Sequence, residues 1–321
     1  MAGRRVALYF AWSRPAEIGA NFGILENRYP TLYEFRRALW PEFESLKKGE
    51  KYSQDISGFL DHVVLHDFQR FAALVKEVTG NEVPIIQRVG NQPPARELDR
   101  DFLAEYDTLV VASLDHFRTE QTATAAEIER VRDFLGREER CVFVCPHHDI
   151  GASGNLKIEE IEFSHHQDRT IPGQQRIGGF ARCLLAGLGF AVENRWGLNP
   201  KAESDGSPAP LLLNPDLDNG GLLKGVTTFN LHPHLPHLDF TPAAVVQVNV
   251  LARQLINPLA APHPFFEAGN RSFHALLALH SPGQWPGRLF VGDATLWSAA
   301  FGGLPSLTAL WRNLANMKMR G

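Results

Sequence analysis

The side chains best suited to catalysis are histidines that stand beside carboxylates in short stretches. The first stretch is His147-His148-Asp149, which directly follows an apolar run. Imidazole titrates near neutral pH, so it can act as a general base or a metal ligand, and a nearby carboxylate can orient it. We therefore predict His147, His148 and Asp149 to be catalytic residues.

A later stretch has the spacing of a metal site. Its candidate ligands are His232, His234, His237 and Asp239. In an extended chain, His-x-His places both imidazoles on one face, a common way to offer two ligands to one divalent metal. The alternative is that these are loop histidines on turns stiffened by Pro233 and Pro236. A third pair is His165-His166, and we expect at least two of the clustered histidines to converge on one polar site.

Two further residues have both a chemical and a structural interpretation. Cys145 ends an apolar run and could be a nucleophile with His147 or His148 as its base, or simply a core thiol. Asp293 follows Gly292 and could hold a ligand or a histidine, or merely cap the next turn. We include Asp293 among the predicted catalytic residues because strand-end acids of α/β sheets lie at the rim of the site.

The elements that must position these residues alternate between apolar strands and amphipathic helices. Strands are predicted near 6–10, 83–88, 108–113, 141–145 and 190–193, with helices over 57–78, 124–135 and 173–188. This alternation is typical of a mostly parallel sheet covered on both faces. Since ligands bind at the carboxyl ends of such strands, Ser113 and Asp115 are predicted to share a rim with His147 and Asp293.

The last third of the chain differs in character. Apolar runs at 226–231, 245–251, 273–279 and 288–291 predict strands with few helices between them, so we expect antiparallel additions at one edge of the sheet. A helix over 304–317 closes the chain, and the Pro- and Gly-rich stretch 198–221 predicts a loop. Without a convincing linker or repeat, residues 1–321 are expected to form a single α/β domain.

This order of elements resembles the class I glutamine-amidotransferase-like fold, in particular the branch that contains trehalose-utilisation-type proteins. The resemblance covers about residues 80 to 315. It is carried by Asp107-Thr108-Leu109-Val110-Val111-Ala112-Ser113, by Cys141-Val142-Phe143-Val144-Cys145-Pro146-His147-His148 and by Gly287-Arg288-Leu289-Phe290-Val291-Gly292-Asp293. It implies a flavodoxin-like, three-layer sheet.

The chain departs from that family where glutaminase chemistry would occur. The resemblance implies a Gly-x-Cys-x-Gly turn and a later His-x-Glu, but Cys145 is followed by Pro146, and His-x-Glu is absent from the sequence. Pro146 has no N–H to offer to an oxyanion. We therefore expect no ammonia release from glutamine.

Two functions remain open on this reading. The first is a hydrolase or lyase that acts on a small polar metabolite at the His- and Asp-rich edge, with a divalent metal as one option. Glu26 and Arg28, which follow the first predicted strand, are candidate substrate-binding residues together with Ser113 and Asp115. The second is a non-catalytic amidotransferase-like scaffold that binds a ligand or a partner.

The composition of the chain limits the classes of partner and cofactor that we expect. A net charge of −4 gives no electrostatic argument for nucleic acid or an anionic membrane. No apolar run approaches the ~20 residues of a membrane span. The three cysteines are interpreted as reduced thiols of a cytoplasmic protein. No Gly-rich loop follows the first strand, so no nucleotide cofactor is expected, and the oligomeric state is not predicted.

Overall fold

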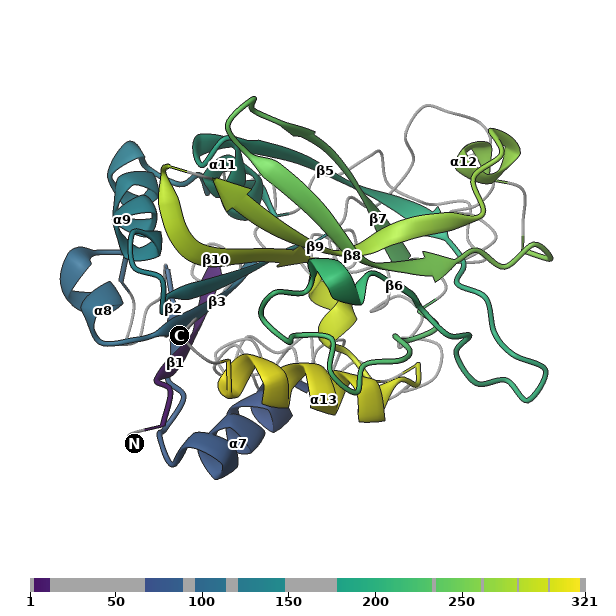
Figure 1. Cartoon of the computed structure of the whole chain (residues 1–321), viewed down its shortest axis with the longest axis horizontal. Helices are drawn as coiled ribbons and strands as arrows, with labels where there is room; N and C mark the ends of the chain where they lie inside the picture. The colour runs from purple at the N-terminus through teal and green to yellow at the C-terminus, as the bar shows by residue number, and fades with distance from the viewer. Residues whose placement is uncertain are drawn as a thin grey trace, which may run out of the picture.

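The computed structural model describes residues 3–11, 67–88, 96–113, 121–147, 178–232, 235–260, 263–281, 283–299 and 301–317. Within them lies an eight-stranded sheet in the order β2-β1-β3-β4-β10-β9-β8-β6 (Figure 1). The strands in that order are Ile85–Gln87, Val6–Ala11, Thr108–Ser113, Cys141–Pro146, Trp285–Gly292, Ser272–Ser281, Gln247–Leu255 and Leu212–Leu213.

The sheet has a parallel half and an antiparallel half. β2, β1, β3, β4 and β10 run parallel to one another, whereas β9, β8 and β6 continue the sheet with antiparallel pairing. The predicted mostly parallel sheet with antiparallel additions in the last third of the chain is therefore confirmed. The carboxyl ends of β1, β3, β4 and β10 consequently meet at one edge.

Helices cover both faces of the parallel half. Leu8 and Phe10 of β1 belong to a core cluster with residues of α7 (Asp67–Thr79) and α13 (Leu304–Ala315), which lie together on one side in Figure 1. Tyr9 faces the opposite cluster, which contains residues of α8 (Arg100–Ala104), α9 (Ala125–Leu135) and α11 (Gly179–Gly187). All six residues of β1, β3 and β4 are buried, as expected for strands with helices on both sides.

Local signals in the sequence fix several element ends. Thr124 Oγ1 accepts a hydrogen bond from Glu127 N at 3.1 Å, and Glu127 Oε2 accepts one from Thr124 N at 2.9 Å. This is the capping box predicted at the start of α9. The end of α7 is followed by Gly80 in the left-handed region, at φ 74°.

A second, two-stranded sheet pairs β5 (Phe190–Leu198) with β7 (Leu235–Pro242). The His- and Pro-rich stretch, for which an extended segment and turns were both considered, is thus partly a strand. Pro236 is compatible with this strand because each strand of a two-stranded sheet has an unpaired edge. The smaller elements are η2 (Pro215–Leu217), α12 (Pro264–Glu267) and η3 (Ala294–Trp297).

The strand predicted at 226–231 is wrong. Val226 and Phe229 are buried as a strand residue would be, but the segment has no strand assignment. Its backbone is satisfied elsewhere: Thr227 N and Thr228 N both donate to Ser306 Oγ at 3.0 Å. The apolar pattern reports burial of the segment, whereas pairing depends on which groups lie opposite it.

Within the described ranges, none of the helices has the length and apolar character needed to cross a membrane.

Candidate functional site at the carboxyl edge of the parallel strands

The carboxyl edge brings three of the predicted site residues to neighbouring strands. Ser113 ends β3, His147 follows β4 and Asp293 follows β10. β3 and β4 are in register from Thr108↔Cys141 to Ser113↔Pro146, and Val144 of β4 pairs with Val291 of β10. All three residues are buried. The topology thus places these three predictions at the same edge of the sheet, and their roles stay predictions.

Ser113 and His147 hold the start of α11 against the sheet. His147 N donates to Ser113 O at 3.1 Å, and Ala181 N donates to Ser113 Oγ at 3.0 Å. Arg182 Nη2 donates to His147 O at 3.3 Å. Gly178, at φ 79°, approaches so closely that a Cβ there would lie 2.9 Å from His147 N. The backbone of His147 is therefore fixed from two elements.

Asp293 begins the short helix η3. Its Oδ1 accepts hydrogen bonds from Thr295 N at 2.7 Å and from Thr295 Oγ1 at 2.5 Å. This is the capping geometry that the sequence allowed as one of two interpretations. Asp293 is buried, with 4% of the residue exposed. Asp293 therefore has at least a structural role at the end of β10.

Cys145 lies close to Asp293 but has the environment of a core thiol. It is completely buried. Burial raises the pKa of the Cys145 thiol well above its usual value, and the negative charge of Asp293 raises it further. Because the thiolate is the nucleophilic form, this environment favours the core interpretation of Cys145 over the catalytic one.

Asn230 connects His232 to the turn that Asp293 begins. Asn230 Nδ2 donates to Thr295 O and to Ser298 O, both at 2.9 Å. Its Oδ1 accepts from His232 N at 3.2 Å, and the His232 ring packs edge-on against Phe301 with centroids 4.8 Å apart. Sequence reasoning missed Asn230, because a single asparagine within an apolar run carries no distinctive signal.

His237 and Asp239 lie on β7 and have separate surroundings. The His237 ring centroid is 4.4 Å from that of Phe265 and 6.2 Å from that of His263. Asp239 instead pairs with Arg195 at 3.4 Å, with its side chain 58% exposed. Among the residues that the structure describes, no group of three or more His, Cys, Asp or Glu is arranged to hold a metal. The metal site stays a prediction.

Several predicted site residues lie outside the residues that the structure describes. They are Glu26, Arg28, Asp115, His148, Asp149, His165, His166 and His234.

A buried ion pair near the same edge was not predicted. Arg88 directly follows β2, and its guanidinium donates to both carboxylate oxygens of Glu127 at 3.1 and 3.0 Å. It also lies 5.0 Å from the centroid of the Phe180 ring. Burial alone would raise the pKa of Glu127, but hydrogen bonds from Arg88 and from Thr124 N outweigh it and lower that pKa. Arg88 stands at the end of a predicted strand and Glu127 belongs to a predicted capping box, but neither local signal indicates that the two side chains pair.

We expect the acid stability of the protein to depend on His237. Burial, with smaller effects from nearby His263 and Arg195, lowers the pKa of His237 to about 3. An unfolded-state histidine titrates near pH 6.5, so the unfolded chain binds the proton first as pH falls. The contribution of the neutral, buried His237 side chain to the free energy of unfolding is therefore complete above pH 6.5 and is lost progressively as the pH falls towards 3. At pH 4.5, two pH units below the unfolded-state pKa, this loss is roughly 3 kcal/mol.

Urea unfolding of wild type and His237→Gln at pH 7 and pH 4.5 measures this effect. The difference in stability between the two pH values should be smaller in the variant by that amount. In NMR spectra of the folded wild type, the His237 ring should stay neutral at pH 5. A His237 titration midpoint near 6.5 in the folded protein contradicts the prediction.

Comparisons with known proteins leave the family of this chain open. No family model matches the sequence, and no curated protein matches it. One similar solved structure is the mmIFT52 N-terminal domain, at 13% identity and a TM-score of 0.42, over 78% of this chain and 92% of that one. A likeness at that level carries no argument about function.

Proposed function

We propose that this protein binds a small polar metabolite at the carboxyl edge of β1, β3, β4 and β10 and acts on it as a hydrolase or lyase. The observation that supports this proposal is the meeting of Ser113, His147 and Asp293 at the ends of three neighbouring parallel strands. Ligands of open α/β sheets bind at this edge, outside the carboxyl ends of the strands.

In this proposal His147 is the general base. Its main chain is held by Ser113 O and by the Arg182 guanidinium, so its imidazole is attached to a rigid part of the scaffold. Rigid attachment supports catalysis because a base must stay within hydrogen-bonding reach of the proton that it removes. Asp293 acts as a positioning residue at the neighbouring strand end.

A specific observation favours a second candidate, a scaffold that binds the same class of ligand without turnover. The Ser113 hydroxyl already accepts from the start of α11, and Asp293 Oδ1 already caps η3. The strand order β2-β1-β3-β4, with helices on both faces, supports a flavodoxin-like arrangement. Because of this arrangement, we propose that the chain has the amidotransferase-like fold but lacks glutaminase activity.

A ligand screen followed by product analysis tests the proposal. Sugars, amino acids and polar amides and esters are screened for thermal stabilisation of the full chain, and every hit is incubated and analysed by mass spectrometry. Zinc, manganese and iron form separate arms for the metal option. We expect a stabilising metabolite to be converted to product, with turnover reduced at least about 100-fold in His147→Gln, the scale of general-base catalysis.

His280→Gln is the matched control, because His280 lies at the other end of β9, next to Ser281, which pairs with Trp285 at the start of β10, and is therefore away from the carboxyl edge. It should keep wild-type turnover. Stabilisation without any product, weakened in His147→Gln alone, overturns the enzyme and supports the scaffold. Equal ligand stabilisation of wild type and a folded His147→Gln, with equal turnover, overturns the site itself.

A further inference from the structure

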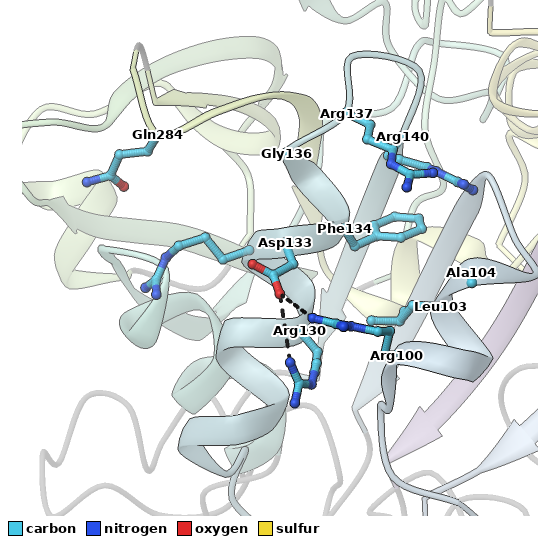
Figure 2. A pocket seen from close by; sticks show the side chains of 11 residues that line it. Arg100, Leu103, Ala104, Arg130, Asp133, Phe134, Gly136, Arg137, Arg140 and Gln284 are labelled. Atoms are coloured by element: carbon cyan, nitrogen blue, oxygen red, sulfur yellow. Dashed lines mark ion pairs between the residues drawn. The ribbon is translucent and has the colours of Figure 1, made fainter.

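An arginine-rich pocket lies at the amino edge of the parallel strands, opposite the edge discussed above. α8, the C-terminal end of α9 and the connection that leads into β4 line it, and Gln284 joins from the turn between β9 and β10 (Figure 2). Its volume is about 670 Å³. Pockets of about 300 to 1,000 Å³ are typical of small-molecule sites.

The lining carries an excess of positive charge in a protein whose net charge is −4. It contains five arginines and one acidic residue, Asp133. The arginines are Arg100, Arg130, Arg132, Arg137 and Arg140.

Two of these arginines are already engaged by the protein. Arg140 donates to Asp107 Oδ1 at 2.9 Å and lies over the Phe134 ring, 5.2 Å from its centroid. Arg132 donates to Gly187 O at 2.7 Å and pairs with Glu129. These two arginines therefore help to build the wall of the pocket.

The other three are poorly neutralised. Arg100 and Arg130 share the Asp133 carboxylate at 3.9 and 3.8 Å, distances too long for hydrogen bonds. Figure 2 marks both ion pairs as dashed lines that run from this carboxylate. The side chain of Arg137 makes no hydrogen bond or ion pair with any residue that the structure describes. Two cations thus share one carboxylate, and Arg137 adds a third cation to the lining of the same pocket.

Folding alone does not account for this arrangement. The C-terminal end of α9 favours nearby cations, which accounts for Arg137 just beyond the helix, whereas Arg130 lies before its last turn. Arg100, however, is in the first turn of α8, where the helix dipole disfavours a positive charge. The side chains of Arg100 and Arg130 are 75% and 40% exposed, so water screens part of their mutual repulsion, and a bound anion would remove the remainder.

We propose that this pocket binds the phosphate group of a small phosphorylated molecule through Arg100, Arg130 and Arg137. Phosphate carries about two negative charges and several acceptor oxygens, which suits three guanidinium groups, whereas a single carboxylate already fails to satisfy two of them. The bound phosphate replaces Asp133 as the partner of Arg100 and Arg130. This site does not depend on the function proposed for the carboxyl edge.

Titrations of the full chain with inorganic phosphate and pyrophosphate, at constant ionic strength against chloride, test the proposal. Calorimetry and thermal stability are the readouts. We expect both anions to bind and stabilise the protein, and Arg130→Gln and Arg137→Gln each to weaken the apparent affinity about tenfold, the loss of one charge-assisted hydrogen bond. Asp133→Asn should instead strengthen binding several-fold, because it removes the competing carboxylate, and misfolding cannot imitate a gain.

The matched control is Arg195→Gln, an exposed arginine on β5 that also has a single carboxylate partner. It should bind phosphate like the wild type. The proposal is overturned if phosphate acts no differently from chloride, or if Arg195→Gln weakens binding as much as Arg130→Gln does. Equal binding of citrate and pyrophosphate also overturns it, because the pocket would then lack selectivity for phosphate.

Discussion

Replacing Arg88 by methionine is expected to destabilise the protein by about 3 to 5 kcal/mol, the usual cost of removing one partner of a buried ion pair. The side chains of Arg88 and Glu127 are 10% and 1% exposed. Without the guanidinium, Glu127 keeps the hydrogen bonds from Leu98 N and Thr124 N but loses both bonds from Arg88. Urea unfolding at pH 7, followed by circular dichroism, measures the loss.

Arg96→Met is the matched control. Arg96 also makes a two-pronged contact with a carboxylate, Asp99, but these side chains are 34% and 49% exposed. Such surface pairs contribute about 0 to 1 kcal/mol. Arg88→Met/Glu127→Gln, which leaves no uncompensated buried charge, should be more stable than Arg88→Met alone. Equal losses for Arg88→Met and Arg96→Met would refute the importance of burial for this pair.

Replacing Gly178 by alanine is expected to cost about 2 to 5 kcal/mol, because two penalties add. A residue with a Cβ is strained in the left-handed region by about 1 to 2 kcal/mol, and overpacking costs about 1 to 3 kcal/mol. The added Cβ would lie 2.9 Å from His147 N and 3.2 Å from both His147 O and Ser113 O, all of them backbone atoms. Thermal and urea unfolding measure the effect.

Gly206→Ala separates the two penalties. Gly206 has φ 83°, but nothing lies within 4 Å of an added Cβ. It should therefore show only the conformational cost, about 1 to 2 kcal/mol. If Gly178→Ala costs no more than Gly206→Ala, the start of α11 does not rest tightly on the ends of β3 and β4, and the rigid placement of His147 in the proposed function loses its support.

The tests of the two proposed sites are independent of each other. The carboxyl-edge proposal is tested by His147→Gln, and the phosphate proposal is tested by Arg130→Gln and Arg137→Gln at the amino edge. A pocket that binds phosphate while no metabolite is converted would leave the phosphate site intact and remove the enzyme. Conversion of a metabolite at the carboxyl edge, with no phosphate binding at the amino edge, would leave the enzyme intact and remove the phosphate site.

Much of the parallel half of the sheet followed from local sequence. The continuous apolar runs that became β1, β3 and β4 can be buried on both sides only where helices cover both faces. The Thr124–Glu127 capping box marked the start of α9 through contacts within four residues. Because parallel strands end at a common edge, the same reasoning anticipated that Ser113, His147 and Asp293 would lie there.

Pairings between segments that are distant in sequence were decided only by the tertiary structure. Nothing near 226–231 in sequence indicates that Ser306 satisfies its backbone, and nothing near Arg88 indicates that Glu127 accepts its charge. The arginine pocket joins α8, α9 and the β9–β10 turn, segments far apart in the chain. Periodicity and capping report only the nearest residues, so they predict elements and their ends. Which charges and donors meet is set by packing of the whole sheet.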